Sequence, residues 1–406
     1  MYEEKNNIAV PPFFGPRWVQ IDLDALKFNV VQIKKLLSPD TKLMAVVKAD
    51  AYGLGAVEVS KAALEAGADM LGVTTIDEGL ELREMGIGAP ILVFTPFMPE
   101  EKDLFIQYDL TATVGSLETA EALLKESFPY PLKVHIKVDT GMNRLGMKPE
   151  EVVEFVSRVY GNPLIELEGL YTHFAASPKG NRPFVERQFK IFKEVVSPLE
   201  ERGYSIPIKH VCNSAALLDM PHMHMDMVRV GTLIYGQYPF GYENRIPLKN
   251  PWEVRAKIIH VKEVSPGEKV GYGGDYTVKK AMRIGIIPVG YADGFGTSPE
   301  MNPKNLLDLL KMLIKKILAF FGIRAGMPLV KYEGLPLKVL GRIGMQLTAV
   351  ELPHDNAGVG SAVSVFIRRT NAGSRLPRLY VSENRVVNIR ISGASRDYAQ
   401  RLGEYS

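Results

Sequence analysis

The sequence predicts an α/β protein with an N-terminal (β/α)8 TIM-like barrel, residues 12–250, and a mostly β domain, residues 251–406. Two observations predict this architecture. Eight short apolar runs alternate with segments of helical periodicity up to about residue 235, and glycine- and proline-punctuated strand patterns follow residue 251. Strands that alternate with helices form parallel βαβ units, and eight such units close a barrel.

The eight strand candidates are apolar runs of four to seven residues, the length expected of buried parallel strands. Helical segments such as AVEVSKAALEAG (56–67) and NRPFVERQFKIFKEVVSPLEERG (181–203) lie between them. The candidates are Leu43–Val47, Met70–Val73, Pro90–Phe94, Leu110–Val114, Leu132–Val138, Leu167–Tyr171, Ile208–Val211 and Met227–Val230.

The second domain is predicted from runs such as RAKIIHVKEV (255–264) and MRIGIIPVGY (282–291), which end at glycine or proline turns. One amphipathic helix near 305–321 interrupts it. The charges at Asp308, Lys311, Lys315 and Lys316 make this helix too polar to span a membrane. We expect it to cover the β domain or a neighbouring subunit rather than to lie on a membrane surface.

Composition and charge are those of a folded soluble protein, with 46% hydrophobic and 23% charged residues. A net charge of +3 over 406 residues favours neither nucleic acid nor a membrane as partner. The single cysteine, Cys212, excludes an intramolecular disulfide framework and a cysteine metal cluster, and no metal site is expected. The polar N-terminus lacks a secretory signal pattern, so the expected location is the cytoplasm.

Polar residues gather where the predicted strands end. Lys48 ends the run in AVVKADAYGLG, and Asp139, His173, Ser214 and Arg229 stand at or just after other strand ends. Each has an ordinary structural interpretation, such as a surface lysine, a satisfied core histidine or a helix N-cap. Their common position at the carboxyl rim of a barrel, where active sites of this fold form, favours a catalytic site.

Lys137 is predicted to face the interior of the barrel. In LKVHIKVD (132–139), apolar residues alternate with Lys133, His135 and Lys137, so these three share one face of the strand. If the apolar face packs on the outer helices, Lys137 points inward. A buried cation there must be neutralised or chemically modified.

The motifs together resemble the alanine racemase family. They are AVVKADAYGLG, KVDTGMNRLGM, THFAASP, CNSAALL, VRVGTLIYG, VGYGGDYTV, VGYADGF and GRIGM, in this order over roughly residues 17–380. The resemblance implies an isomerase that uses pyridoxal 5'-phosphate, with a barrel followed by a β domain. It also implies a homodimer with active sites shared between subunits, and a role in making D-alanine for peptidoglycan.

The resemblance assigns roles to residues at the matching positions. Lys48 and Tyr272 match the two catalytic bases, which stand on opposite faces of a small amino-acid substrate, and Lys48 also bonds to the cofactor aldehyde. Arg144 and Met345 match residues around the substrate carboxylate. Lys137 matches a lysine that is carbamylated in several members, the alternative being an unmodified lysine paired with an acid. The remaining matches are to cofactor-binding residues: Tyr52, Ser214, Gly231 and Thr232 at the phosphate, Arg229 at the pyridine nitrogen, and His173 between Arg229 and Tyr272.

Three other functions are weighed against alanine racemisation. A single-domain cofactor carrier has no second domain in which Tyr272 and Met345 would have a place. A barrel-type decarboxylase usually carries a catalytic cysteine in its β domain, and this chain has none after Cys212. A racemase for serine, lysine or several amino acids stays open, because Gly344 and Gln346 depart from the family pattern around Met345. Tyr380 is a weak candidate for a further phosphate-contacting tyrosine.

Overall fold

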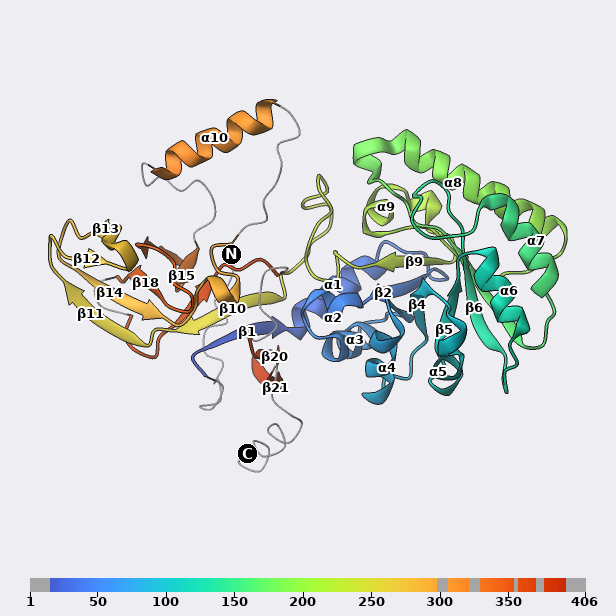
Figure 1. Cartoon of the computed structure of the whole chain (residues 1–406), viewed down its shortest axis with the longest axis horizontal. Coiled ribbons are helices and arrows are strands. Elements are labelled where there is room, and N and C mark those ends of the chain that lie inside the picture. The colour runs from blue at the N-terminus through green and yellow to red at the C-terminus, as the bar shows by residue number, and fades with distance from the viewer. Residues whose placement is uncertain (1–14, 298–305, 321–328, 354–356, 370–375, 392–406) are drawn as a thin grey trace. The chain divides into compact units, whose positions relative to one another are not determined.

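The computed structural model describes residues 15–297, 306–320, 329–353, 357–369 and 376–391 (Figure 1). The N-terminal segment, where no secretory signal is expected, lies outside these residues. The chain divides into two compact units, one of residues 22–251 and one that joins residues up to 21 with residues from 252 onward.

The first unit is built on an eight-stranded parallel sheet in the order β8-β7-β6-β5-β4-β3-β2-β9. Each predicted strand is confirmed, with ends that shift by no more than two residues. The strands are β2 (Lys42–Val46), β3 (Met70–Val73), β4 (Ile91–Pro96), β5 (Thr111–Val114), β6 (Leu132–Lys137), β7 (Ile165–Tyr171), β8 (Ile208–His210) and β9 (Met227–Val230).

Backbone hydrogen bonds between β8 and β9 bring the two ends of the sheet together. The Asp226 N–H donates to the Lys209 carbonyl at 3.1 Å, and the Arg229 N–H donates to the Cys212 carbonyl at 3.0 Å. Helices surround this sheet (Figure 1). The predicted fold class, a (β/α)8 barrel with a mostly β second part, is therefore confirmed.

The helices of this unit present apolar stripes to the sheet. In α8, Val185, Phe189, Phe192 and Val196 are buried at the three- and four-residue spacing of one helix face. The longer helices are α1 (Leu23–Lys34), α3 (Ala56–Glu65), α4 (Ile76–Glu84), α5 (Lys102–Gln107), α6 (Leu117–Lys125), α7 (Pro149–Val159), α8 (Pro178–Glu201) and α9 (Ser214–Asp219).

Within the described residues, the second unit contains a seven-stranded sheet, a four-stranded sheet and a two-stranded ribbon. The seven-stranded sheet has the order β16-β15-β19-β10-β1-β20-β21, and the four-stranded sheet the order β11-β14-β18-β17. The strands are β1 (Arg17–Asp22), β10 (Trp252–Lys257), β11 (His260–Val264), β12 (Lys269–Val270), β13 (Tyr276–Thr277), β14 (Met282–Ile287), β15 (Val330–Tyr332), β16 (Leu335–Leu337), β17 (Val339–Leu340), β18 (Thr348–Glu351), β19 (Ala362–Val365), β20 (Arg378–Ser382) and β21 (Arg385–Arg390).

Strand β1 differs from the expected domain boundary. The sequence interpretation placed residues from 12 onward in the barrel, whereas β1 pairs antiparallel with β10 and belongs to the second unit. The physical reason is burial of Trp18 and Val19, each 1% exposed, in that sheet. Such pairing joins segments more than two hundred residues apart and leaves no local signal.

The predicted inserted helix is present as α10 (Leu306–Phe320), and residues 305 and 321 of the predicted range lie outside the described residues. Among the helices that the structure describes, none combines the length and the apolar character needed to cross a membrane.

Candidate active site

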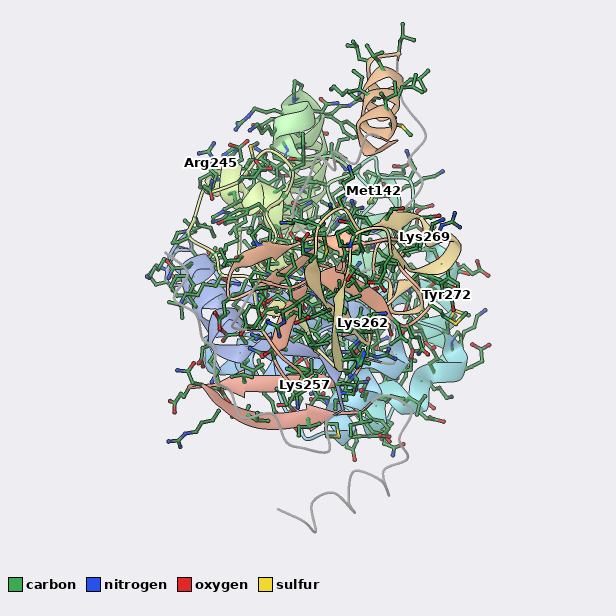
Figure 2. All side chains as sticks on the ribbon, turned by 90° about the vertical axis from the view of Figure 1, so that its left-hand side faces the viewer. Met142, Arg245, Lys257, Lys262, Lys269 and Tyr272 are labelled. Carbon is green, nitrogen blue, oxygen red and sulfur yellow. The ribbon has the colours of Figure 1, made fainter. Side chains whose placement is uncertain are left out.

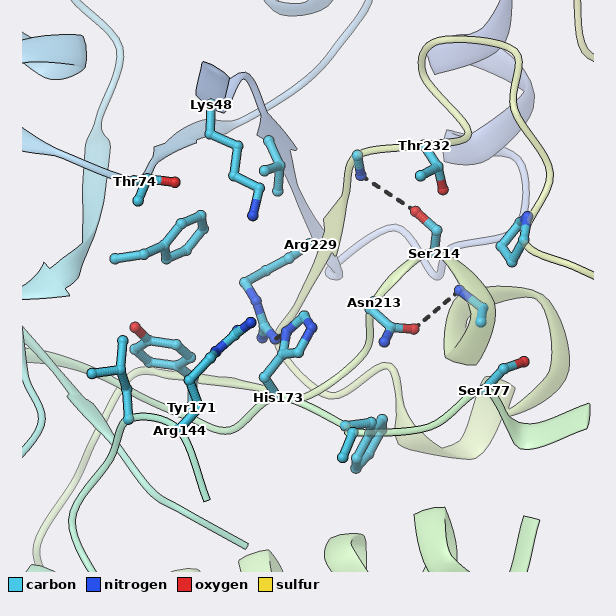
Figure 3. Close-up of a pocket in the computed structure, with 18 of the residues that line it drawn as sticks. Lys48, Thr74, Arg144, Tyr171, His173, Ser177, Asn213, Ser214, Arg229 and Thr232 are labelled. Atoms are coloured by element: carbon cyan, nitrogen blue, oxygen red, sulfur yellow. Dashed lines mark hydrogen bonds between the residues drawn. The ribbon is translucent and has the colours of Figure 1, made fainter. Parts of the chain in front are cut away.

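A cavity of about 610 Å³ opens at the carboxyl ends of the barrel strands (Figure 3), within the range of small-molecule sites. It brings together nine of the residues singled out in the sequence. These are Lys48, Tyr52, Lys137, Arg144, His173, Ser214, Arg229, Gly231 and Thr232. In the described part of the chain, no aspartate or glutamate lines this cavity. The site is therefore cationic and fits an anionic ligand.

Lys48 begins an unusual left-handed turn, α2 (Lys48–Tyr52). Residues 49 to 52 all have φ between 52° and 55°, although none is glycine. Left-handed backbone costs roughly 1–2 kcal/mol per residue, so other contacts must hold the turn. The Ala49 N–H donates to Glu78 Oε1 at 2.6 Å, and the Ala56 N–H donates to Asp50 Oδ1 at 2.9 Å. This strained turn lets Lys48 and Tyr52 line one cavity.

Tyr52, Ser214 and Gly231 form a compact cradle at one end of the cavity. The Gly231 N–H donates to Ser214 Oγ at 3.3 Å (Figure 3), and the Tyr52 ring packs on Tyr235 with centroids 4.7 Å apart. A Cβ at position 231 would lie 2.5 Å from Tyr52 Oη, so a glycine is required there. Burial raises the pKa of Tyr52, which keeps its phenol protonated as a donor. Hydroxyl and backbone donors around a space without acids fit a phosphate ester.

Arg229 is 4% exposed and is held by backbone carbonyls. Its Nη2 donates to the Thr172 carbonyl at 2.7 Å, and its Nη1 donates to the His210 carbonyl at 2.9 Å. Burial lowers the pKa of Arg229 to about 10, so it stays protonated near neutral pH. Burial, with the Arg229 charge, lowers the pKa of His173 to about 3, and its Nδ1 lies 3.3 Å from Arg229 Nη2. A neutral His173 accordingly accepts a hydrogen bond from Arg229.

Lys137 lies at the inner face of β6, as its strand periodicity predicts, and is 5% exposed. Burial, followed by the charges of Arg229 and Arg144, lowers the pKa of the Lys137 amine to about 8. Asp139 opposes this lowering. Its Oδ1 accepts the N–H groups of residues 141, 142 and 143 at 2.9–3.1 Å, which fixes the turn that carries Arg144. Much of the Lys137 population is therefore a neutral amine near pH 8.

Comparison with known proteins decides the family. The model for the N-terminal domain of alanine racemase matches residues 21–239, and the model for its C-terminal domain matches residues 252–379. The chain belongs to the alanine racemase family.

Relatives and solved structures agree with this membership. An alanine racemase of Methanococcus maripaludis is 41% identical over 357 residues, which cover 86% of this chain and 89% of that protein. An alanine racemase of Geobacillus stearothermophilus is 43% identical over 290 residues, 70% of this chain and 74% of that protein. The structure of an alanine racemase from Clostridium difficile 630 is 34% identical with a TM-score of 0.79, and the match covers 94% of this chain and 100% of that chain.

In this member of the alanine racemase family, three predicted residues do not line the cavity. Tyr272, Met345 and Tyr380 belong to the second unit, whereas the described lining residues all belong to the first. Tyr272 is 77% exposed on a short helical turn, and its side chain lies at the surface in Figure 2. Met345 is 59% exposed, and its carbonyl accepts the Ala292 N–H at 3.0 Å, so the motifs VGYADGF and GRIGM contact each other.

Sequence reasoning missed two buried residues of this alanine racemase family member. Tyr171, which lines the cavity, and His210 stack with ring centroids 4.8 Å apart. Burial raises the pKa of Tyr171 to about 12, so its phenol stays protonated, and its Oη lies 3.1 Å from Thr113 Oγ1. The available signal was a polar aromatic residue at the last position of one predicted strand and at the last but one of another.

Proposed function

We propose that the protein is an alanine racemase that interconverts L-alanine and D-alanine with pyridoxal 5'-phosphate and two bases. The observation that carries this proposal is the acid-free cavity. It combines a lysine amine that can bond to an aldehyde, a cradle of donors that fits a phosphate ester, and a buried arginine that can donate to a pyridine nitrogen. The family membership supports the same reaction.

The residues present fit the cofactor. Lys48 would bond to its aldehyde, and Tyr52, Ser214 and the backbone of Gly231 and Thr232 would hold its phosphate. When bound, pyridoxal 5'-phosphate supplies an electron-withdrawing group that acidifies the α-C–H bond of the substrate. Arg229 would face the pyridine nitrogen, and because guanidinium is a donor that keeps its proton, that nitrogen would stay unprotonated.

The chain's own groups move the proton. Racemisation requires removal of the α-proton from one face of the substrate and delivery of a proton to the other. Lys48 Nζ is the base on one face, and Tyr272 Oη is the base on the other. Arg144 binds the substrate carboxylate with the backbone N–H of Met345, and this contact orients the α-C–H bond between the two bases.

Lys137 would position Arg144 after carbamylation. The neutral Lys137 amine would attack carbon dioxide. An N–C bond forms as one C=O π bond breaks and its electron pair moves to oxygen, and an N–H proton leaves to solvent, so a carbamate anion results. That anion would replace a buried cation beside Arg144, and the lowered pKa of Lys137 makes the reactive neutral amine available. Carbon-13 NMR with labelled bicarbonate should show a carbamate signal that is lost in Lys137→Met, and a wild-type protein without the signal contradicts this role.

The active unit would be a cytoplasmic homodimer in which Tyr272 and Met345 of one chain complete the site of the other. The exposure of Tyr272 and its absence from the described cavity lining support this arrangement. Lys48→Ala chains mixed with Tyr272→Phe chains should regain about one intact site per heterodimer. No recovery after verified subunit exchange would argue against shared sites.

The function itself is tested by incubating purified protein and cofactor with L-alanine and measuring D-alanine by chiral chromatography. Lys48→Ala should abolish the activity. Lys42→Ala is the matched control, because Lys42 is exposed at the start of β2, the strand that precedes Lys48, and does not line the cavity. Release of carbon dioxide would instead indicate a decarboxylase, and bound cofactor without turnover would indicate a carrier.

A further inference from the structure

We propose that Glu168, His135 and His210 act as positioning residues that hold Arg229 through a chain of oriented hydrogen bonds inside the barrel. This inference rests on the proposed function only for its kinetic consequence. The chain of hydrogen bonds itself is a property of the folded protein, whatever reaction it catalyses.

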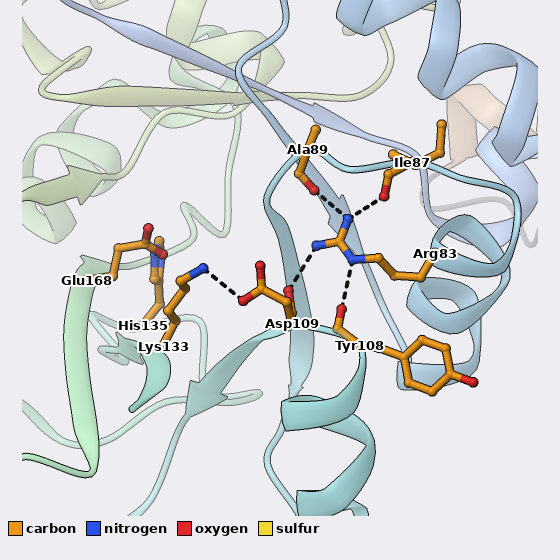
Figure 4. A network of polar contacts seen from close by, with 8 residues as sticks. All are labelled: Arg83, Ile87, Ala89, Tyr108, Asp109, Lys133, His135 and Glu168. Atoms are coloured by element: carbon orange, nitrogen blue, oxygen red, sulfur yellow. Dashed lines mark hydrogen bonds and ion pairs between the residues drawn. The ribbon is translucent and has the colours of Figure 1, made fainter. Parts of the chain in front are cut away.

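The three side chains connect Arg229 to a carboxylate at the other end of the barrel interior. Glu168 Oε2 lies 3.0 Å from His135 Nε2, His135 Nδ1 lies 2.9 Å from His210 Nε2, and His210 Nδ1 lies 3.1 Å from Arg229 Nη1. Both histidines are 0% exposed, and Figure 4 shows the Glu168–His135 end of the chain.

Arg229 fixes every proton along this hydrogen-bonded chain. Arg229 only donates, so His210 Nδ1 must be a lone pair and His210 Nε2 must carry its proton. That proton points at His135 Nδ1, which leaves the His135 proton on Nε2, directed at the Glu168 carboxylate. Burial, followed by the Arg229 charge, lowers the pKa of His210 well below its usual value, so a single neutral tautomer results.

The backbone is shaped around this chain. The β6–β7 register shifts at His135, so that Val134 pairs with Leu167 and His135 with Gly169, which leaves Glu168 as an extra residue on β7. A bulge of this kind re-aims a side chain. Gly169 makes room for the imidazole, because a Cβ there would lie 2.4 Å from His135 Nδ1.

The positive charge of the cavity explains why Arg229 needs a charged acceptor at the far end of the hydrogen-bonded chain. Lys48, Lys137, Arg144 and Arg229 line a cavity to which the described residues contribute no acid. Burial raises the pKa of Glu168, but the hydrogen bond from His135 and the nearby charges, Lys133 and Lys42 among them, together outweigh it, so the net pKa is lowered and the carboxylate stays charged. Glu168 is therefore a charged acceptor at one end of the hydrogen-bonded chain, and His210 Nδ1 is the acceptor for the buried Arg229 at the other end.

The test compares Glu168→Gln with Glu166→Gln. Both remove one negative charge from β7, but Glu166 is exposed and is not part of the chain. A glutamine at 168 still offers His135 Nε2 an oxygen acceptor, but a neutral one, so the tautomers set by Arg229 are kept and the His135 hydrogen bond weakens. Circular dichroism verifies the fold of each variant.

The first readout is nitrogen-15 NMR of histidine-labelled holoenzyme, assigned by single histidine substitutions. All three proteins should show protonated Nε2 and unprotonated Nδ1 at His135 and His210, and only Glu168→Gln should move the signal of the His135 Nε2 proton upfield, because its acceptor is no longer charged. This measurement needs no turnover, so it judges the chain even if the proposed function fails. Protonated Nδ1 in wild type, or an unchanged His135 Nε2 proton signal in Glu168→Gln, overturns the inference.

The second readout is steady-state kinetics with alanine. Glu168→Gln should lower kcat by about tenfold to a hundredfold, as expected when a hydrogen bond to a charged group is weakened. KM should change little, because Arg144 is not part of the hydrogen-bonded chain, and kcat is normalised to the concentration of folded, cofactor-loaded enzyme so that a loss of active protein is not read as a lower kcat. An unchanged kcat in Glu168→Gln overturns the positioning role.

Discussion

Lys137 provides a quantitative test of the electrostatics of the cavity. Its amine is 5% exposed, and burial, with Arg229 and Arg144 nearby, lowers its pKa from 10.5 to about 8. Below pH 8 the amine is protonated in both the folded and the unfolded chain, and the folded state carries a cost of about 3 kcal/mol for the buried cation. Between pH 8 and pH 10.5 the folded chain releases the proton first, so this cost disappears as the pH rises.

Lys137→Met removes the cation and should stabilise the unmodified protein. In buffer free of carbon dioxide, we expect the variant to exceed wild type in free energy of unfolding by about 3 kcal/mol at pH 7 and by only about 1 kcal/mol at pH 9.5. Urea denaturation at both pH values measures the difference, and groups that titrate in both proteins cancel.

Lys133→Met is the matched control on the same strand. The hydrogen bond from Lys133 to Asp109 raises the pKa of its amine, so its contribution is constant below pH 10.5 and no trend is expected in this window. A difference between Lys137→Met and wild type that stays constant from pH 7 to pH 9.5 would refute the reasoning. Added bicarbonate should reverse the sign, because a carbamate anion beside Arg144 would then be lost in the variant.

Two further substitutions test the geometry of the cavity. Gly231→Ala should weaken cofactor binding at least about tenfold, because its Cβ would lie 2.5 Å from Tyr52 Oη, whereas Gly88→Ala has open space and should bind normally. Equal affinities in an absorbance titration would contradict the cradle. Ala49→Gly should raise the free energy of unfolding by about 1 kcal/mol, because glycine adopts φ near 52° without strain. Ala62→Gly in the right-handed helix α3 should lower it by about 1 kcal/mol or more, and a loss of stability in Ala49→Gly as well would contradict the strain assigned to the turn.

The sequence predicts the barrel well because its strands are local features. A buried parallel strand is a short apolar run, and Met70–Val73 and Met227–Val230 have the same ends in the sequence and in the structure. The rim residues follow from the same pattern, since the fold places strand ends together. Lys48 and Arg229 can therefore be assigned to one site from the sequence alone.

Other features depend on the rest of the fold and have no local signal. Alanine has no preference for left-handed backbone, so the turn after Lys48 is set by Glu78, 29 residues from the N–H that it holds. The contact between Glu168 and His135 depends on a register shift between β6 and β7, which the alternation of residues in a single strand does not reveal. Strand β1 likewise depends on its distant partner β10.

The most direct test of the two-base proposal is racemisation of L-alanine in deuterium oxide, stopped early and followed by chiral separation and mass spectrometry. If Lys48 and Tyr272 act from opposite faces, the proton delivered comes from a different, solvent-exchanged group than the one that was removed. We therefore predict that newly formed D-alanine carries deuterium at its α-carbon. D-alanine that keeps the original α-proton, or no D-alanine at all from the cofactor-loaded protein, would contradict the proposal.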